Sequence, residues 1–239
     1  MIEVRDLYMR FGAVRALSGV SLSAVDGTIT GLVGQNGAGK TTTLNIVSGL
    51  HEPNQGAVVL DGFSTTPQDR RSRIGALLDQ KGLYSRLTAR ENVEYFGALR
   101  GFEGGELNRR TQHALATVGL ESVAHRRTEG FSQGERMKVA LARAIVHSPR
   151  HLLLDEPTNG LDVPSARGFK AALRRMRDDG VCVVVSSHMI EDLGTLCDSI
   201  VIIAGGRVVA QGSASDLCRQ TQSATLEESF MVFNGLQGE

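Results

Sequence analysis

Short apolar runs separated by turns dominate the first sixty residues of the chain. The alternation of apolar and polar positions predicts strands over residues 2–7, 14–24, 28–33 and 57–60. Between residues 30 and 50 an apolar strand leads through a glycine-rich turn into a segment with helical spacing, which includes Leu44 and Val47. This region is therefore predicted to be rich in β-structure and to contain one strand–loop–helix unit.

Helical periodicity replaces this pattern from about residue 86 to residue 147. A helix is predicted to begin at Thr88, because a Thr followed three residues later by Glu can form a capping box. A second helix fits residues 107–118, and a third begins at Ser132 with the same capping pattern. These helices are interpreted as a lobe inserted into an α/β domain.

Strands and helices alternate again after Pro149. Residues 151–154 form a continuous apolar run, which is typical of a parallel strand buried on both faces. The periodicity then predicts an amphipathic helix over 164–179, a buried strand over 181–185, a hairpin turning at Gly205-Gly206, and a terminal helix over 225–233.

Composition and charge narrow the classes of partner. The 26 Lys and Arg residues balance 26 Asp and Glu residues, so the chain has no overall field that attracts nucleic acid, and no nucleic-acid partner is expected. The longest stretch without a charged residue, 27–39, is 13 residues long. A spanning helix needs roughly 20 apolar residues. The charged start is unlike a signal peptide, and the three widely spaced cysteines show no zinc or disulfide pattern, which favours the cytosol.

Residues 34–41 match a phosphate-binding loop and follow an apolar strand, as such a loop must. Its glycines allow backbone N–H groups to surround phosphate oxygens, Lys40 can reach the β- and γ-phosphates, and the Thr41 hydroxyl can bind Mg²⁺. The predicted nucleotide-binding residues here are Gly34, Gln35, Asn36, Gly37, Ala38, Gly39, Lys40, Thr41 and Thr42.

Two carboxylates directly follow the predicted buried strand at 151–154. Asp155 can hold a metal ion through its water shell, and Glu156 can face the γ-phosphate and position or deprotonate the attacking water. An apolar strand that ends in Asp is common by itself. Together with the phosphate-binding loop, the pair predicts ATP hydrolysis with Mg²⁺.

A further segment, Phe-Ser-Gln-Gly-Glu at residues 131–135, resembles the signature of ABC (ATP-binding cassette) transporter ATP-binding subunits, which usually reads Leu-Ser-Gly-Gly-Gln. Three of the five positions differ, but the Ser and the second Gly are kept. The resemblance, which extends from about residue 2 to residue 235, implies contacts to the ATP held by an opposite subunit, from Ser132, Gln133, Gly134 and Glu135. The alternative is that Ser132 and Glu135 only cap the helix, and both roles can hold at once.

Other positions match the same family. The segment 159–162, which ends in Asp162, resembles the loop that links the two subunits, and His188 stands where the family has its switch histidine. Phe11 resembles the aromatic residue that stacks on adenine, with Tyr8 as the competing candidate.

The glutamine that the family uses near the metal is the weakest match. Its position falls on Asp79, with Gln80 one residue later. We favour Gln80 as a metal-binding and catalytic residue, because an amide can bridge the metal and the lytic water without adding charge. The sequence from 82 to 92, together with the signature, resembles the exporter branch that includes sodium-extrusion and drug-efflux ATPases.

The resemblance implies an α/β fold of the phosphate-binding-loop NTPase class of ABC type, with a mixed sheet, an N-terminal antiparallel β region and an inserted helical lobe. A single nucleotide-binding domain is expected. Its parts are a catalytic core (residues 1–85 and 148–215), the helical lobe (86–147) and a C-terminal helical tail (216–239).

The resemblance also implies function and partners. ATP and Mg²⁺ are the expected cofactors, and a second nucleotide-binding subunit, expected to be another copy, completes a head-to-tail dimer. Its motion passes to a polytopic membrane permease through a groove beside residues 79–92, so the chain is expected to be cytoplasmic and peripheral on the inner face of the membrane. The alternatives are a soluble ABC ATPase without a transport role and a phosphate-loop kinase. The kinase has no use for residues 132–135 or His188.

Overall fold

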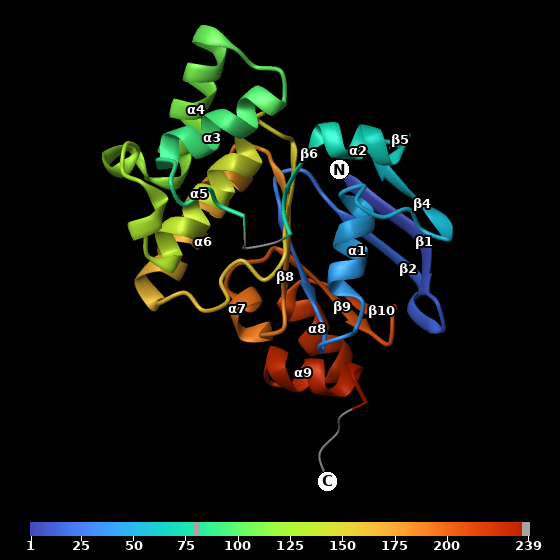
Figure 1. Ribbon diagram of the computed structural model, residues 1–239. Helices are drawn as coiled ribbons and strands as arrows, with labels where there is room; N and C mark the ends of the chain where they lie inside the picture. Colours follow the sequence, from blue (N-terminus) through green and yellow to red (C-terminus); the bar gives the residue numbers. More distant parts are fainter. Residues whose placement is uncertain (79–81, 236–239) are drawn as a thin grey trace.

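The computed structural model describes residues 1–78 and 82–235, and its strands form two sheets. The first sheet is antiparallel and lies on the right of Figure 1. Its strands, in spatial order, are β2 (Val14–Ala24), β1 (Ile2–Phe11), β4 (Gln55–Leu60) and β5 (Phe63–Ser64).

The second sheet is mixed, because five neighbouring strands run parallel and the edge strand β10 is antiparallel to β9. Its spatial order is β10 (Arg207–Gly212), β9 (Ser199–Ala204), β3 (Ile29–Val33), β8 (Cys182–Ser187), β7 (His151–Leu154) and β6 (Ile74–Leu77). The predicted mixed sheet and the antiparallel N-terminal region are both confirmed.

Alternate residues of the second sheet face two different hydrophobic cores. In β7, Leu152 and Leu154 belong to the core shared with the helical lobe, whereas Leu153 belongs to the core shared with the first sheet. Val183 and Val184 divide in the same way in β8. Both faces of these strands are therefore buried, which explains why their sequences are continuous apolar runs.

The helices occupy distinct places around these sheets. The helix α1 (Lys40–Val47) packs in the core between the two sheets. The lobe at the upper left of Figure 1 contains α3 (Ala89–Leu99), α4 (Gly104–Val118) and α5 (Gln133–Ile145). The remaining helices are α2 (Pro67–Arg73), α6 (Val163–Asp178), α7 (Ile190–Gly194), α8 (Ala214–Thr221) and α9 (Leu226–Phe233).

Local sequence signals set several element boundaries as predicted. The side chains of Thr88 and Ser132 accept hydrogen bonds from the third helical N–H in capping boxes, and α4 ends at Gly119 with φ 68°. The prediction for the first strand was too short, because β1 continues to Phe11. A register shift after Val4 interrupts the alternation there, and Asp6 has φ 48°.

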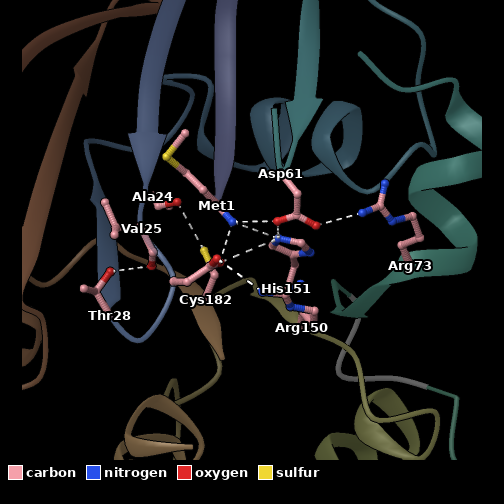
Figure 2. Close-up of polar contacts among 10 residues, drawn as sticks. Met1, Ala24, Val25, Thr28, Asp61, Arg73, Arg150, His151 and Cys182 are labelled. Atoms are coloured by element: carbon pink, nitrogen blue, oxygen red, sulfur yellow. Dashed lines mark hydrogen bonds and ion pairs between the residues drawn. The ribbon is translucent and has the colours of Figure 1, made fainter. Parts of the chain in front are cut away.

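A cluster of ion pairs ties the two sheets together beside the start of β1 (Figure 2). Asp61, which follows β4, lies 2.8 Å from the Met1 amino nitrogen, 3.1 Å from His151 Nε2 and 2.7 Å from Arg73 Nη2. Asp26 also pairs with the Met1 amino group. Burial lowers the pKa of His151, although Asp61 opposes this effect. The cluster thus joins β1 and β4 of one sheet to β7 of the other.

The three cysteines are free thiols. Cys182 donates to the Ala24 carbonyl at 3.4 Å, and burial raises the pKa of Cys182 and of Cys197 to about 12. Both thiols therefore stay protonated and unreactive near neutral pH. Among the described helices, none is both long enough and apolar enough to cross a membrane.

Candidate functional site

Two positions in the loop between β3 and α1 admit only glycine. At Gly39, φ is 111°, and a Cβ atom there would lie 2.7 Å from Leu17 Cδ2. At Gly34 a Cβ atom would lie 2.3 Å from the Ile203 carbonyl oxygen. The loop is closed by a hydrogen bond from Ala38 N–H to the Gln35 carbonyl at 3.1 Å. Packing therefore fixes the curl of this loop.

The loop leads directly into the N-terminus of α1, which is open to an anion. Gly39 occupies the N-cap position and provides no side-chain cap, and the first turn contains no acidic residue. The first hydrogen bond of the helix runs from Thr43 N–H to the Gly39 carbonyl at 2.9 Å. The preceding N–H groups and the helix dipole can therefore bind phosphate oxygens.

Lys40 is held at the centre of this loop. Its Nζ atom donates to the carbonyls of Gly34 at 2.7 Å and Gln35 at 3.2 Å, and lies 3.8 Å from Glu156 Oε1. The side chain is only 7% exposed, and burial lowers the pKa of Lys40 while Glu156 and Asp155 act against this change. A phosphate oxygen can replace the loop carbonyls as the partner of this ammonium group.

Thr41 and Asp155 come from different elements and meet beside Lys40. The Thr41 hydroxyl donates to Asp155 Oδ2 at 2.7 Å, and the Ser186 hydroxyl donates to the other carboxylate oxygen. Hydroxyl and carboxylate oxygens are hard ligands of the type that Mg²⁺ prefers. The donor set therefore fits this ion.

Glu156 and His188 meet because β7 and β8 are parallel neighbours whose carboxyl ends share one edge of the sheet. His188 Nδ1 lies 2.7 Å from Glu156 Oε2. The Glu156 backbone has φ 49°, and its N–H donates to Ser186 Oγ at 3.0 Å. The carboxylate is thus oriented by a histidine on one side and faces the Lys40 ammonium on the other.

A pocket of about 490 Å³ lies between these groups. Its lining residues are Ala16, Asn36, Gly37, Gly39, Lys40, Thr41, Thr42, Glu156, Asn159 and His188. Phe11 lies at the end of β1, 46% exposed, with its ring edge against His51. Tyr8 lines a separate pocket that also contains Arg15. The structure therefore gathers the phosphate-binding and hydrolytic residues and leaves both adenine candidates outside their pocket.

The segment 132–135 is placed apart from this pocket, at the N-terminus of α5. Ser132 Oγ accepts a hydrogen bond from Glu135 N–H at 3.1 Å, and Glu135 Oε2 accepts one from Ser132 N–H at 2.9 Å. Asp162 caps α6 in a similar way by accepting from Ser165 N–H at 2.7 Å. Both segments therefore cap a helix.

Four further residues concern the site: two lie outside the described residues, and the pocket contacts of the other two were not predicted. Gln80 and its alternative Asp79 lie outside the described residues. Ser186 was not predicted, although it contacts Asp155. Asn159 was predicted only as part of the segment 159–162 that links two subunits, and it also lines the pocket. The signal for Ser186 is the strand register: Leu154 pairs with Val185, so the residues that follow them, Asp155 and Ser186, are placed side by side.

Comparisons with known proteins agree on one family. Residues 17–159 match the model of the ABC transporter family. The ABC transporter ATP-binding protein NatA of Bacillus subtilis is 39% identical over 238 residues, which cover 97% of each chain. The linearmycin resistance ATP-binding protein LnrL of the same organism is 32% identical over 95% of this chain and 73% of its own.

Solved structures extend this likeness to the fold. A structure of the ATP-binding subunit of an ABC transporter superposes with a TM-score of 0.85 at 30% identity, covering 98% of this chain and 99% of that one. A dimeric post-hydrolysis state of the ATP-binding cassette MJ0796, bound to ADP and Pi, gives a TM-score of 0.78 at 29% identity over 89% of this chain and 98% of that one.

Proposed function

The chain belongs to the ABC transporter family, and from that membership we propose that two copies of it close head to tail on ATP and drive export through a separate membrane subunit. It is an ATPase and the ATP-binding subunit of an ABC transporter. The observation that carries the proposal is the pocket at the N-terminus of α1, where Lys40, Glu156 and His188 converge.

Within one chain, the loop and α1 bind the phosphates. The N–H groups that begin α1 and the Lys40 ammonium neutralise the β- and γ-phosphates. Thr41 and Asp155 hold Mg²⁺, with Gln80 as the further ligand predicted by the sequence. The ion, when bound, supplies positive charge against the phosphate oxygens. Phe11 is the proposed adenine contact, since it is exposed at the end of β1.

Hydrolysis rests on the Glu156 carboxylate. Its contact with His188 at 2.7 Å holds one oxygen in a fixed direction, and the Lys40 ammonium at 3.8 Å opposes its charge. The carboxylate orients the attacking water and accepts its proton. His188 both positions this carboxylate and lies in the pocket wall, where it can contact the γ-phosphate.

The second chain supplies the other wall of each ATP site. Among the described residues that line the pocket, none comes from 132–135. Ser132 and Gln133 are exposed at the N-terminus of α5, a position where an anion is stabilised. We assign Ser132 and the first N–H groups of α5 to the γ-phosphate held by the partner, so that ATP joins the two chains and its hydrolysis releases them.

A groove of about 430 Å³ between the core and the lobe is the proposed seat of the membrane subunit. It combines apolar side chains with three arginines, and the relevant lining residues are Leu77, Leu78, Phe96, Arg71, Arg100 and Arg143. Leu78 of its lining directly precedes the region 79–92 that the sequence indicated, and Arg143 donates to the Gly82 carbonyl within that region. The occupant that fits is an apolar segment of the permease that carries an acidic side chain.

The arginines favour an acidic partner because their charges are poorly hydrated. Burial lowers the pKa of Arg100 and of Arg143, and the Arg143 guanidinium lies 3.7 Å over the Phe96 ring. Arg100 and Arg143 donate to main-chain carbonyls, at 2.9 Å and 2.7 Å. Within the described part of the chain neither forms an ion pair, so a carboxylate from another protein gains a charge-assisted contact.

The proposed partners also indicate where the chain lies in the cell and in which direction the transporter moves its substrate. A chain that docks on a permease through this groove lies on the cytoplasmic face of the membrane as a peripheral subunit. The name of the relative LnrL, a linearmycin resistance protein, supports export rather than import. Contacts to the cargo lie in the membrane subunit.

The test is purification of the tagged Glu156→Gln chain with ATP from detergent-solubilised membranes of its host. Loss of the proton acceptor should lower turnover by about 10²–10⁴-fold while ATP binding persists, so an ATP-bound dimer should accumulate together with a polytopic membrane protein. A double variant with Arg100→Glu and Arg143→Glu should keep the dimer and lose the membrane protein. Recovery of soluble partners alone would instead support a soluble ABC ATPase.

A further inference from the structure

The segment 132–135 is in direct contact with the loop 159–162 of its own chain. Gln133 Nε2 donates a hydrogen bond to the Asn159 carbonyl at 3.2 Å. A Cβ atom added at Gly160 would lie 2.8 Å from the same Nε2 atom, so the amide is pressed against the loop backbone. Gly134 packs equally closely on α6, since a Cβ atom there would lie 2.3 Å from Ser165 Oγ. The first turn of α5 is therefore in direct contact with this loop and with α6.

The same loop leads back to the catalytic carboxylate. The Asn159 N–H donates to the Glu156 carbonyl at 3.2 Å, and Asn159 itself lines the phosphate pocket. Glu156 has a left-handed backbone conformation, which non-glycine residues adopt only when their surroundings hold them in it. Two consecutive hydrogen bonds thus connect the Gln133 side chain to the backbone that orients Glu156.

The Gln133 amide that donates to the Asn159 carbonyl departs from the usual family signature. The usual signature carries glycine where this chain has Gln133, and glycine has no side chain with which to hold the loop. An exposed glutamine at a helix N-terminus has little reason to be ordered unless it makes such a contact. The contact lies within one chain. It connects the segment 132–135, which is assigned to the ATP held by the partner, with Glu156, which is assigned to the ATP held by the same chain.

We propose that Gln133 is a positioning residue that couples the two ATP sites of the dimer, by holding the 159–162 loop, and through it Glu156, in register with the segment 132–135. The inference rests on the proposed function. When the γ-phosphate of one site draws Ser132 inward, Gln133 pulls the Asn159 carbonyl and sets Glu156 at the other site. Hydrolysis at one site is then faster when the other site has closed.

The test compares variants that remove or keep the hydrogen-bond donor. Gln133→Glu has the same shape but presents only acceptors to the Asn159 carbonyl, Gln133→Ala removes the group, and Gln133→Lys keeps a donor. Gln112→Ala is the matched control, because Gln112 is an exposed helical glutamine on α4, far along the chain from the loop. Each chain is assayed for ATP hydrolysis over a range of ATP concentrations.

We expect the Glu and Ala variants to lose about fivefold to tenfold in kcat, which corresponds to the loss of one hydrogen bond. The ATP concentration for half-saturation should change by less than about twofold, and the Hill coefficient should fall toward one. The Lys variant should restore kcat and the Hill coefficient, and Gln112→Ala should behave as the wild type. A change in half-saturation alone would overturn the proposal, because it would mean that Gln133 touches nucleotide and does not position the loop.

Hydrogen exchange on the nucleotide-free chain provides a readout that needs no activity. The peptide covering residues 157–162 should exchange faster in Gln133→Ala and Gln133→Glu than in the wild type, and at the wild-type rate in Gln112→Ala. Equal exchange and equal Hill coefficients in all variants, with a wild type that hydrolyses ATP, would refute the coupling and leave the proposed function intact. A wild type that neither hydrolyses ATP nor dimerises would refute the proposed function itself.

Discussion

The phosphate pocket and the segment 132–135 are both helix N-termini suited to anions, yet they are built differently. The pocket is assembled from distant parts of one chain, with Thr41 hydrogen-bonded to Asp155 and Glu156 to His188. The segment 132–135 is held by its own capping box and by contacts of Gln133 and Gly134 within one chain, and it presents Ser132 to solvent. The first region is therefore organised before ATP arrives, whereas the second awaits a ligand brought by another chain.

The largest effect should come from the organised pocket. Lys40→Ala removes the buried ammonium from the phosphate site, and we expect turnover to fall by about 10²–10³-fold. ATP affinity of the single chain should fall by about 10–100-fold, because a charge-assisted hydrogen bond is lost. Phosphate release and equilibrium nucleotide binding measure the two quantities. Unchanged ATP affinity would show that the pocket is not organised around Lys40.

Ser132→Asp should separate the capping role of the exposed segment from its proposed role in ATP binding. Asp is as good an N-cap as Ser, so the free energy of unfolding should stay within about 0.5 kcal/mol of the wild-type value. The new carboxylate repels the partner's γ-phosphate by several kcal/mol, so ATP-dependent dimerisation and turnover should fall by about 10²-fold. ATP binding to the single chain should be unchanged.

Ser213→Asp is the control for this variant. Ser213 caps α8 with the same box, accepting from Asp216 N–H at 3.2 Å, and α8 is not part of either region. This substitution should leave dimerisation and turnover as they are. If Ser132→Asp were as active as Ser213→Asp, the segment 132–135 would be a helix cap only, and the contrast between the two regions would disappear.

The smallest effect on turnover is expected at His147, which lies between the end of α5 and the start of β7. Burial lowers the pKa of His147 to about 4, and the charges of Arg100 and Arg110 add to this effect. The unfolded chain therefore binds a proton at this residue more readily, so the contribution of His147 to the free energy of unfolding is greatest above pH 6.5 and is lost as the pH falls toward 4. Near neutral pH we expect no change in turnover when His147 is replaced.

His147→Gln should remove this part of the acid sensitivity. Between pH 7 and pH 5 the wild type should lose about 2 kcal/mol more unfolding free energy than the variant, measured by urea denaturation at each pH. His113→Gln, at an exposed position on α4, is the matched control and should follow the wild type. Equal losses of unfolding free energy in all three proteins would show that His147 does not contribute to the acid sensitivity.

Much of the fold could be predicted because its signals are local. Both capping boxes in the lobe, the turn at Gly205-Gly206 and the buried run at 151–154 were correct. The helix α2 and the strand β6 were missed, although Thr66 and Pro67 are a readable helix start. Strand β6 has only four residues and is recognisable mainly by its pairing with β7, which is a tertiary property.

The residues of the candidate site differ in the same way: some are marked by local sequence signals, and others depend on tertiary contacts. Lys40, Asp155 and Glu156 belong to contiguous motifs, so spacing alone identified them. Ser186 and the contact between Gln133 and Asn159 depend on which strands and loops become neighbours, and one sequence does not encode that directly. The parts that the sequence missed are those that join segments far apart in the chain.

The most direct test of a site shared between two chains is to mix two variants that are each inactive alone. A mixed dimer of Lys40→Ala and Ser132→Asp chains contains one intact site, formed by Lys40 of one chain and Ser132 of the other. We expect ATP hydrolysis, which should be at least about 10²-fold below the wild-type rate in either protein alone, to recover when they are combined and to rise with the amount of mixed dimer. A mixture that stays inactive while both chains remain folded would contradict it.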